Sequence, residues 1–163
     1  MCAERTPLAE DESHIAAEIR EQISTLSKEG RLAQTTDYIQ HGTVSVYEHC
    51  LSVTRCSCHI ARLLRIPIDR RSLIRGALLH DYFLYDWHDK TALANRQRLH
   101  GFHHPARALK NAREDFDLTN VESNIILRHM FPLVPVPPTC REGWIVCLAD
   151  KVCATKETLF CRS

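Results

Sequence analysis

The chain has 163 residues, enough for one domain with a short additional segment, and a formal net charge of +1. That balance excludes a global electrostatic attraction to nucleic acid or to an anionic membrane, so we expect neither as a partner. No apolar run approaches the roughly 20 residues of a membrane span, and acidic residues rather than an apolar core follow the first five positions. We therefore expect a cytoplasmic protein.

Histidine is unusually frequent, with ten residues, and here the composition points toward function. The eight cysteines form no Cys-x-x-Cys pair, and most of them fall on apolar helical faces. Free cysteine is among the most buried residue types. We therefore expect the cysteines to fill the core rather than to form disulfides or thiolate metal sites.

Helical periodicity dominates the chain, which has five glycines and no strand-like alternation between turns. Apolar residues at helical spacing predict a first helix over 8–26, and Gly30 is its stop signal. A shorter helix over 31–40 and a turn at His41-Gly42 follow. The pattern predicts an all-α fold.

The next two helices carry clear start signals. Ser45 and Glu48 have the spacing of a capping box, and they open a long helix over 45–64. Asp69 is a suitable N-cap for a helix over 70–83.

An irregular stretch over 85–98 separates these helices from the last part of the chain, where we expect three more. Pro105 suits the first turn of a helix, and Thr119 with Glu122 repeats the capping-box spacing. The proline-rich segment 132–138 is expected to be extended. The three helices are predicted over 105–116, 119–129 and 139–159.

The adjacent residues His80 and Asp81 are the most informative feature of the sequence. An imidazole and a carboxylate that follow one another can supply two ligands to one metal ion. Further candidate ligands stand on or at the ends of the predicted helices, and they are His49, His104, His129 and Asp150.

Mixed nitrogen and oxygen ligands suit one or two divalent transition-metal ions such as Fe, Mn, Zn, Co or Ni. With His104 and His129 available, Asp81 can bridge to a second ion. Two metal ions ~3.5–4 Å apart are a standard arrangement for phosphoester hydrolysis. We assign catalytic roles to Asp81 and to two cations beside the ligands, Lys151 and Arg128, with Arg107 as a further candidate.

The ordered residues His49, His80-Asp81 and Asp150 resemble the signature of the HD superfamily of metal-dependent phosphohydrolases. The resemblance covers approximately residues 41 to 160. The stretches that carry it are Tyr47-Glu48-His49-Cys50-Leu51-Ser52-Val53, Ala77-Leu78-Leu79-His80-Asp81, His104-Pro105-Ala106-Arg107-Ala108 and Leu148-Ala149-Asp150-Lys151.

The resemblance implies a helical bundle with a central metal-binding cleft. Residues 41–163 would form the HD domain, and residues 1–40 an N-terminal helical extension packed on its core. The additional His104 and His129 resemble those of six-ligand members that hold two metal ions. Either His103 or His104 can face the metal, and we favour His104 because its family counterparts also stand at this helix start.

The resemblance also implies a phosphohydrolase that acts on a small, nucleotide-like phosphorylated substrate through a metal-activated water. Two alternatives stay open. Some HD-fold proteins use a di-iron centre to activate dioxygen, and the same six ligands would serve that chemistry. A non-catalytic module that binds metal or nucleotide is the other.

Overall fold

The computed structural model describes residues 7–85 and 100–160, and these residues are mostly helical, which confirms the predicted fold class. In the described ranges the one sheet is a two-stranded hairpin, and no helix is long and apolar enough to cross a membrane. The elements, in chain order, are α1 (Pro7–Glu29), the 3-10 helix η1 (Leu32–Asp37), β1 (Ile39–His41), β2 (Val44–Ser45), α2 (Val46–Leu64), α3 (Arg70–Leu79), α4 (His100–Asp115), α5 (Asn120–Arg128) and α6 (Arg141–Phe160).

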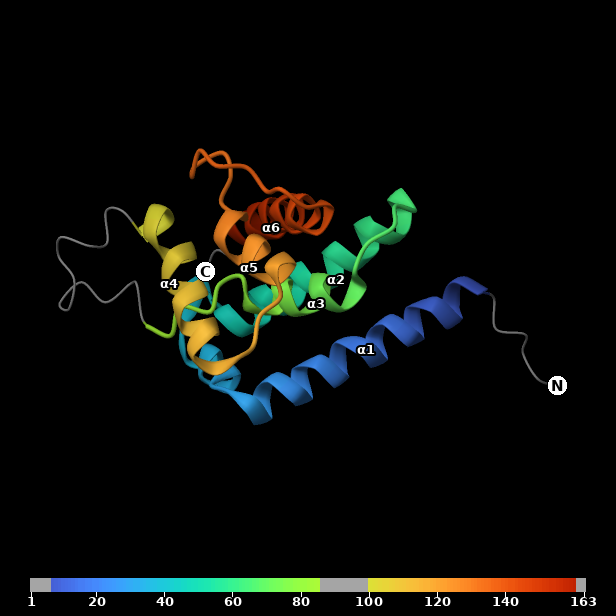
Figure 1. The fold of residues 1–163 in the computed structure, drawn as a ribbon, viewed down its shortest axis with the longest axis horizontal. Helices are drawn as coiled ribbons and strands as arrows, with labels where there is room; N and C mark the ends of the chain where they lie inside the picture. The colour runs from blue at the N-terminus through green and yellow to red at the C-terminus, as the bar shows by residue number, and fades with distance from the viewer. Residues whose placement is uncertain (1–6, 86–99, 161–163) are drawn as a thin grey trace.

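Helix α3 is the centre of the bundle. It packs against α2 and α5 most extensively and also contacts α1 and α6, with α1 and α6 on opposite sides of it (Figure 1). Residues 72–79 are all buried, as expected for a helix that has neighbours all round. Because α3 ends at Leu79, the residues that follow it emerge in the interior of the bundle.

Helix α1 shares the hydrophobic core of the bundle. Its Leu26 is completely buried in the same cluster as Leu73 of α3. Just beyond α1, the Arg31 guanidinium makes two hydrogen bonds of 2.8 Å to the carboxylate of Asp115 in α4. The division of the chain into an extension and an HD domain at residue 40 stays a prediction.

The capping signals read from the sequence are confirmed. The Ser45 hydroxyl accepts the Glu48 backbone N–H at 3.2 Å, and the Glu48 carboxylate accepts the Ser45 N–H at 2.9 Å. Thr119 and Glu122 form the same reciprocal pair, and Asp69 caps α3. These side chains satisfy N–H groups that lack intrahelical partners, so the starts of α2, α3 and α5 are fixed locally.

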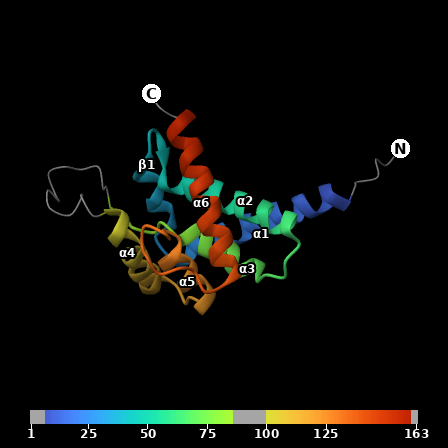
Figure 2. The same ribbon diagram turned by 90° about the horizontal axis from the view of Figure 1, so that it is seen from above.

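The helix predicted over 31–40 is wrong, because it is replaced by the short η1 and the strand β1. The hydroxyls of Thr35 and Thr36 each donate to the carbonyl three residues earlier, at 2.6 and 2.7 Å, which competes with continuation of an α-helix. The predicted turn at His41-Gly42 is present, and Gly42 has a φ of 58° that glycine adopts without steric cost. The hairpin lies beside α6 (Figure 2).

The boundaries of α3 and α4 also differ from the prediction. Helix α3 was expected to reach 83, but the imidazole of His80 donates to the Ala77 carbonyl at 2.8 Å and caps the helix end. Pro105 lies inside α4 rather than at its start, since the described part of α4 begins at His100. The proline removes one backbone hydrogen bond, and its burial against the bundle offsets that loss.

Segment 132–138 is not helical, but it forms turns and bends rather than the extended connector that we expected, with the Val134 N–H donating to the Met130 carbonyl at 3.3 Å. Helix α6 begins at Arg141, slightly later than predicted. The irregular stretch predicted over 85–98 lies outside the described residues except for Tyr85.

Candidate metal centre

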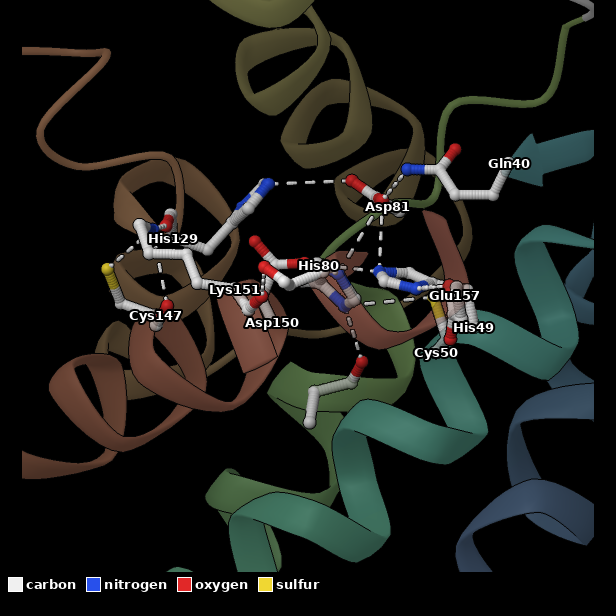
Figure 3. A network of polar contacts seen from close by, with 12 residues as sticks. Gln40, His49, Cys50, His80, Asp81, His129, Cys147, Asp150, Lys151 and Glu157 are labelled. Atoms are coloured by element: carbon white, nitrogen blue, oxygen red, sulfur yellow. Dashed lines mark hydrogen bonds and ion pairs between the residues drawn. The ribbon is translucent and has the colours of Figure 1, made fainter. Parts of the chain in front are cut away.

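The six side chains predicted as metal ligands come from five parts of the chain and meet in the interior, and all of them except His104 are labelled in Figure 3. Helix α2 provides one, the end of α3 two, and α4, the end of α5 and α6 one each. Each of the six residues is at most 8% exposed. They are His49, His80, Asp81, His104, His129 and Asp150.

Asp81 lies between two pairs of imidazoles and presents a different oxygen to each pair. Its Oδ2 is 3.9 Å from His49 Nε2 and 3.5 Å from His80 Nε2. Its Oδ1 is 3.1 Å from His104 Nε2 and 3.4 Å from His129 Nε2. A carboxylate with this placement can bridge two metal ions.

Asp150 lies beside the imidazoles of His49 and His80. Its Oδ1 is 3.1 Å from His49 Nε2 and 3.8 Å from His80 Nε2. The ligand atoms of these three residues lie within 4.8 Å of one another, as do those of His80, Asp81 and His129. Both groups are compact enough to hold an ion.

The second pair of imidazoles has the separation expected of two ligands to one ion. His104 Nε2 and His129 Nε2 are 2.9 Å apart. Two nitrogens at right angles on a metal ion, each about 2.1 Å from it, lie about 3 Å apart. His104 is buried whereas the adjacent His103 is exposed, so the structure favours His104 as the ligand of the two.

In three of the imidazoles, Nε2 faces the cluster and Nδ1 contacts an acceptor outside it. His80 Nδ1 donates to the Ala77 carbonyl at 2.8 Å, and His129 Nδ1 donates to the Ile126 carbonyl at 2.9 Å. His49 Nδ1 is 2.8 Å from a carboxylate oxygen of Glu157. A neutral imidazole that donates from Nδ1 has an unprotonated Nε2, so each of these rings can offer Nε2 to a metal ion.

Two buried polar atoms indicate that the cluster fits a cation. His80 Nε2 and Asp81 Oδ1 have no hydrogen-bond partner within the residues that the structure describes, although both atoms are inaccessible to solvent. Buried polar atoms in folded proteins are nearly always paired. A metal ion among these atoms would satisfy both, and the nitrogen and carboxylate donors are those that divalent transition metals prefer.

The acidic members of the cluster are held in the ionised form. Burial alone would raise the pKa of Asp81, but the imidazoles of His80 and His104 outweigh it and hold that pKa well below its ordinary value. Burial likewise opposes ionisation of Asp150, but the hydrogen bond with His49 and the nearby imidazole of His80 outweigh it, so the pKa of Asp150 is also far below the usual range. Both carboxylates are therefore available as ligands at neutral pH.

The surroundings raise the pKa of one imidazole and lower the pKa of another. Burial lowers the pKa of His49, but hydrogen bonds to Asp150 and Glu157 outweigh burial and raise that pKa to about 10. Burial dominates at His129 and lowers its pKa. The carboxylates around His49 thus favour a positive charge at this ring. A metal ion can supply that charge in place of a proton.

Two residues that the sequence interpretation missed touch the cluster. Gln40 of β1 donates from Nε2 to Asp81 Oδ2 at 2.6 Å, and Glu157 of α6 contacts His49. Gln40 lies in the segment that was wrongly predicted as a helix. Glu157 follows Asp150 by seven residues, a spacing that places both on one face of α6, so the sequence did contain a signal for it.

The three predicted cations have different surroundings. Lys151 Nζ donates to the carbonyls of His129 and Cys147 at 3.1 and 3.2 Å. Arg128 is half-buried in the last turn of α5. Arg107 is exposed, and its guanidinium carbon is 4.8 Å from the centre of the Tyr85 ring. Their catalytic roles stay predictions.

The chain matches a known protein family. A family model described as HD domain matches residues 46–155. No curated protein and no solved structure matches the chain. The matched segment contains all six clustered ligands, whereas Gln40 and Glu157 fall outside it.

Proposed function

The chain belongs to the HD-domain family, and on that premise we propose that it is a metal-dependent phosphohydrolase acting on a small, nucleotide-like phosphorylated compound. HD domains are typically metal-dependent phosphohydrolases. The observation that carries the proposal for this chain is the placement of Asp81, which offers one carboxylate oxygen to each of two buried imidazole pairs.

In this proposal, two ions share Asp81 as a common ligand. His49, His80 and Asp150 complete the first site, and His104 and His129 contribute to the second. When bound, Fe, Mn, Zn, Co or Ni ions supply Lewis acidity toward a phosphoryl oxygen and a hydroxide nucleophile at neutral pH.

Side chains around the metal centre would orient its ligands and offset charge on the substrate. Gln40 holds one oxygen of Asp81 through its 2.6 Å hydrogen bond and thereby keeps the carboxylate oriented between the two imidazole pairs. Lys151 is anchored by two backbone carbonyls, so its charge is fixed close to His129. Together with Arg128 it would offset the negative charge that develops on a phosphoryl group.

The proposal is tested by metal analysis combined with a substrate screen. We expect the purified protein to contain a divalent transition metal, and we expect phosphate release from nucleotides or general phosphoesters to stop after chelation and return on metal addition. Oxygen consumption without phosphate release would instead identify a di-iron oxygenase. Bound metal with neither activity would identify a binding module.

We expect His129→Ala to lower the bound metal from two ions toward one per chain, because His129 contributes to the second group and not to the first. Elemental analysis of the purified variant measures this directly. His103→Ala is the matched control, since it removes an exposed imidazole from the same region and should leave the metal count unchanged. Two bound ions in His129→Ala would refute the assignment of His129 to the second ion, and a single bound ion in the wild type would refute a dinuclear centre.

A further inference from the structure

Glu157 is a buried acid of α6 that lies outside the matched HD segment, so family membership assigns it no role. It is 8% exposed, and its Oε2 is 2.8 Å from His49 Nδ1. It follows Asp150 by seven residues, which is about two helical turns. Asp150 and Glu157 therefore face the same imidazole, with Asp150 at Nε2 and Glu157 at Nδ1.

The position of His49 in its helix explains why this ring needs an acceptor from another element. His80 and His129 stand at the C-terminal ends of α3 and α5 and donate to carbonyls of their own last turns. The last carbonyls of a helix lack intrahelical partners, whereas the first turn has unpaired N–H donors instead. His49 is in the first turn of α2, where its own helix offers no free carbonyl to accept the Nδ1–H.

The contact with His49 accounts for the burial of Glu157. A buried carboxylate costs several kcal/mol unless it is paired. Among the side chains that the structure describes, that of His49 is the one basic group within 4.0 Å of the Glu157 carboxylate. The contact with His49 is thus the electrostatic reason for an acid at this position.

We propose that Glu157 is a positioning residue of the metal centre. Its carboxylate accepts the Nδ1–H of His49 and holds the ring so that the Nε2 lone pair points toward the ion beside Asp150. This inference rests on the proposed function, because it requires that the cluster binds metal. Removal of such a partner typically weakens metal binding about 10–100-fold.

The test is a Co²⁺ titration of the metal-free protein, followed by absorption spectroscopy and by competition with a chelator. We expect Glu157→Gln to weaken Co²⁺ binding about 10–100-fold, because the amide oxygen can still accept the Nδ1–H but lacks the charge. Glu157→Ala should weaken binding further, since it removes the acceptor as well. A changed Co²⁺ spectrum in these variants would report the altered ligand orientation.

Glu142→Gln is the matched control, because Glu142 is on the same helix and is 7% exposed. Its carboxylate accepts the Asp69 backbone N–H at 2.8 Å and touches none of the clustered ligands. We expect this variant to bind Co²⁺ as the wild type does. Thermal unfolding of the metal-free proteins provides the second measurement.

The possible outcomes separate this inference from the proposed function. Equal Co²⁺ affinity in the wild type and Glu157→Gln would overturn the inference, even if the variant unfolded at a lower temperature, because Glu157 would then serve only the fold. A wild type that binds no Co²⁺ would refute the proposed function and, with it, the role of Glu157. Weakened binding in Glu157→Gln but not in Glu142→Gln supports the inference.

Discussion

Replacing Asp81 with alanine is expected to remove the bound metal and to lower phosphohydrolase activity by at least about 10³-fold. Within the described part of the chain, Asp81 is the one side chain whose oxygens approach both imidazole pairs, so its loss affects both proposed ion sites at once. Elemental analysis and a phosphate-release assay measure the two effects.

The helical content of the Asp81→Ala variant should stay close to that of the wild type. Asp81 lies beyond the end of α3, and the caps that the structure describes for α2, α3 and α5 do not involve its side chain. Circular dichroism therefore distinguishes loss of the site from loss of the fold. Asp37→Ala, which removes an exposed carboxylate, is the matched control and should retain metal and activity. Full activity and metal in Asp81→Ala would contradict the proposed function.

Several ligands of the candidate centre could be predicted because they lie near helix ends, which short-range signals identify, whereas His104 and Asp150 lie within α4 and α6. His80 and Asp81 are adjacent in sequence, and capping signals located the starts of α2 and α5 that precede His49 and His129. Once the elements are located, imidazoles and carboxylates at their ends are natural candidates for a shared interior site. The structure brings all of these predicted ligands together.

The residues around the ligands were harder to predict because their roles depend on tertiary contacts. Gln40 reaches Asp81 only because residues 39–45 form a hairpin, and helical periodicity over 31–40 concealed that hairpin. Glu157 resembles an ordinary acid of an exposed helical face until α6 is packed against α2. The interior position of Pro105 is a similar case, because proline favours a helix start locally but packing can offset its lost hydrogen bond.

A buried ion pair between Arg75 of α3 and Glu122 of α5 should control the stability of the framework that carries these ligands. The Arg75 Nε is 2.8 Å from Glu122 Oε1, and the two residues are 5% and 2% exposed. The other oxygen of Glu122 accepts the Thr119 N–H at the start of α5. The pair therefore joins the helix that precedes His80 to the helix that precedes His129.

We expect Arg75→Met to lower the free energy of unfolding by about 3–5 kcal/mol, because it leaves the buried Glu122 carboxylate without its cation. Urea unfolding of the metal-free protein measures this loss. Arg70→Met is the matched control, since Arg70 pairs with Glu18 at a site where the side chains are 40% and 29% exposed, and exposed pairs contribute about 0–1 kcal/mol.

The double variant Arg75→Met with Glu122→Gln should recover most of the lost stability. The glutamine amide removes the uncompensated charge and can still accept the Thr119 N–H, so the cap of α5 is retained. Replacement of both members of a buried ion pair is often close to neutral, whereas removal of one is strongly destabilising. If the double variant were as unstable as Arg75→Met, the loss would come from packing of the arginine stem rather than from the buried charge.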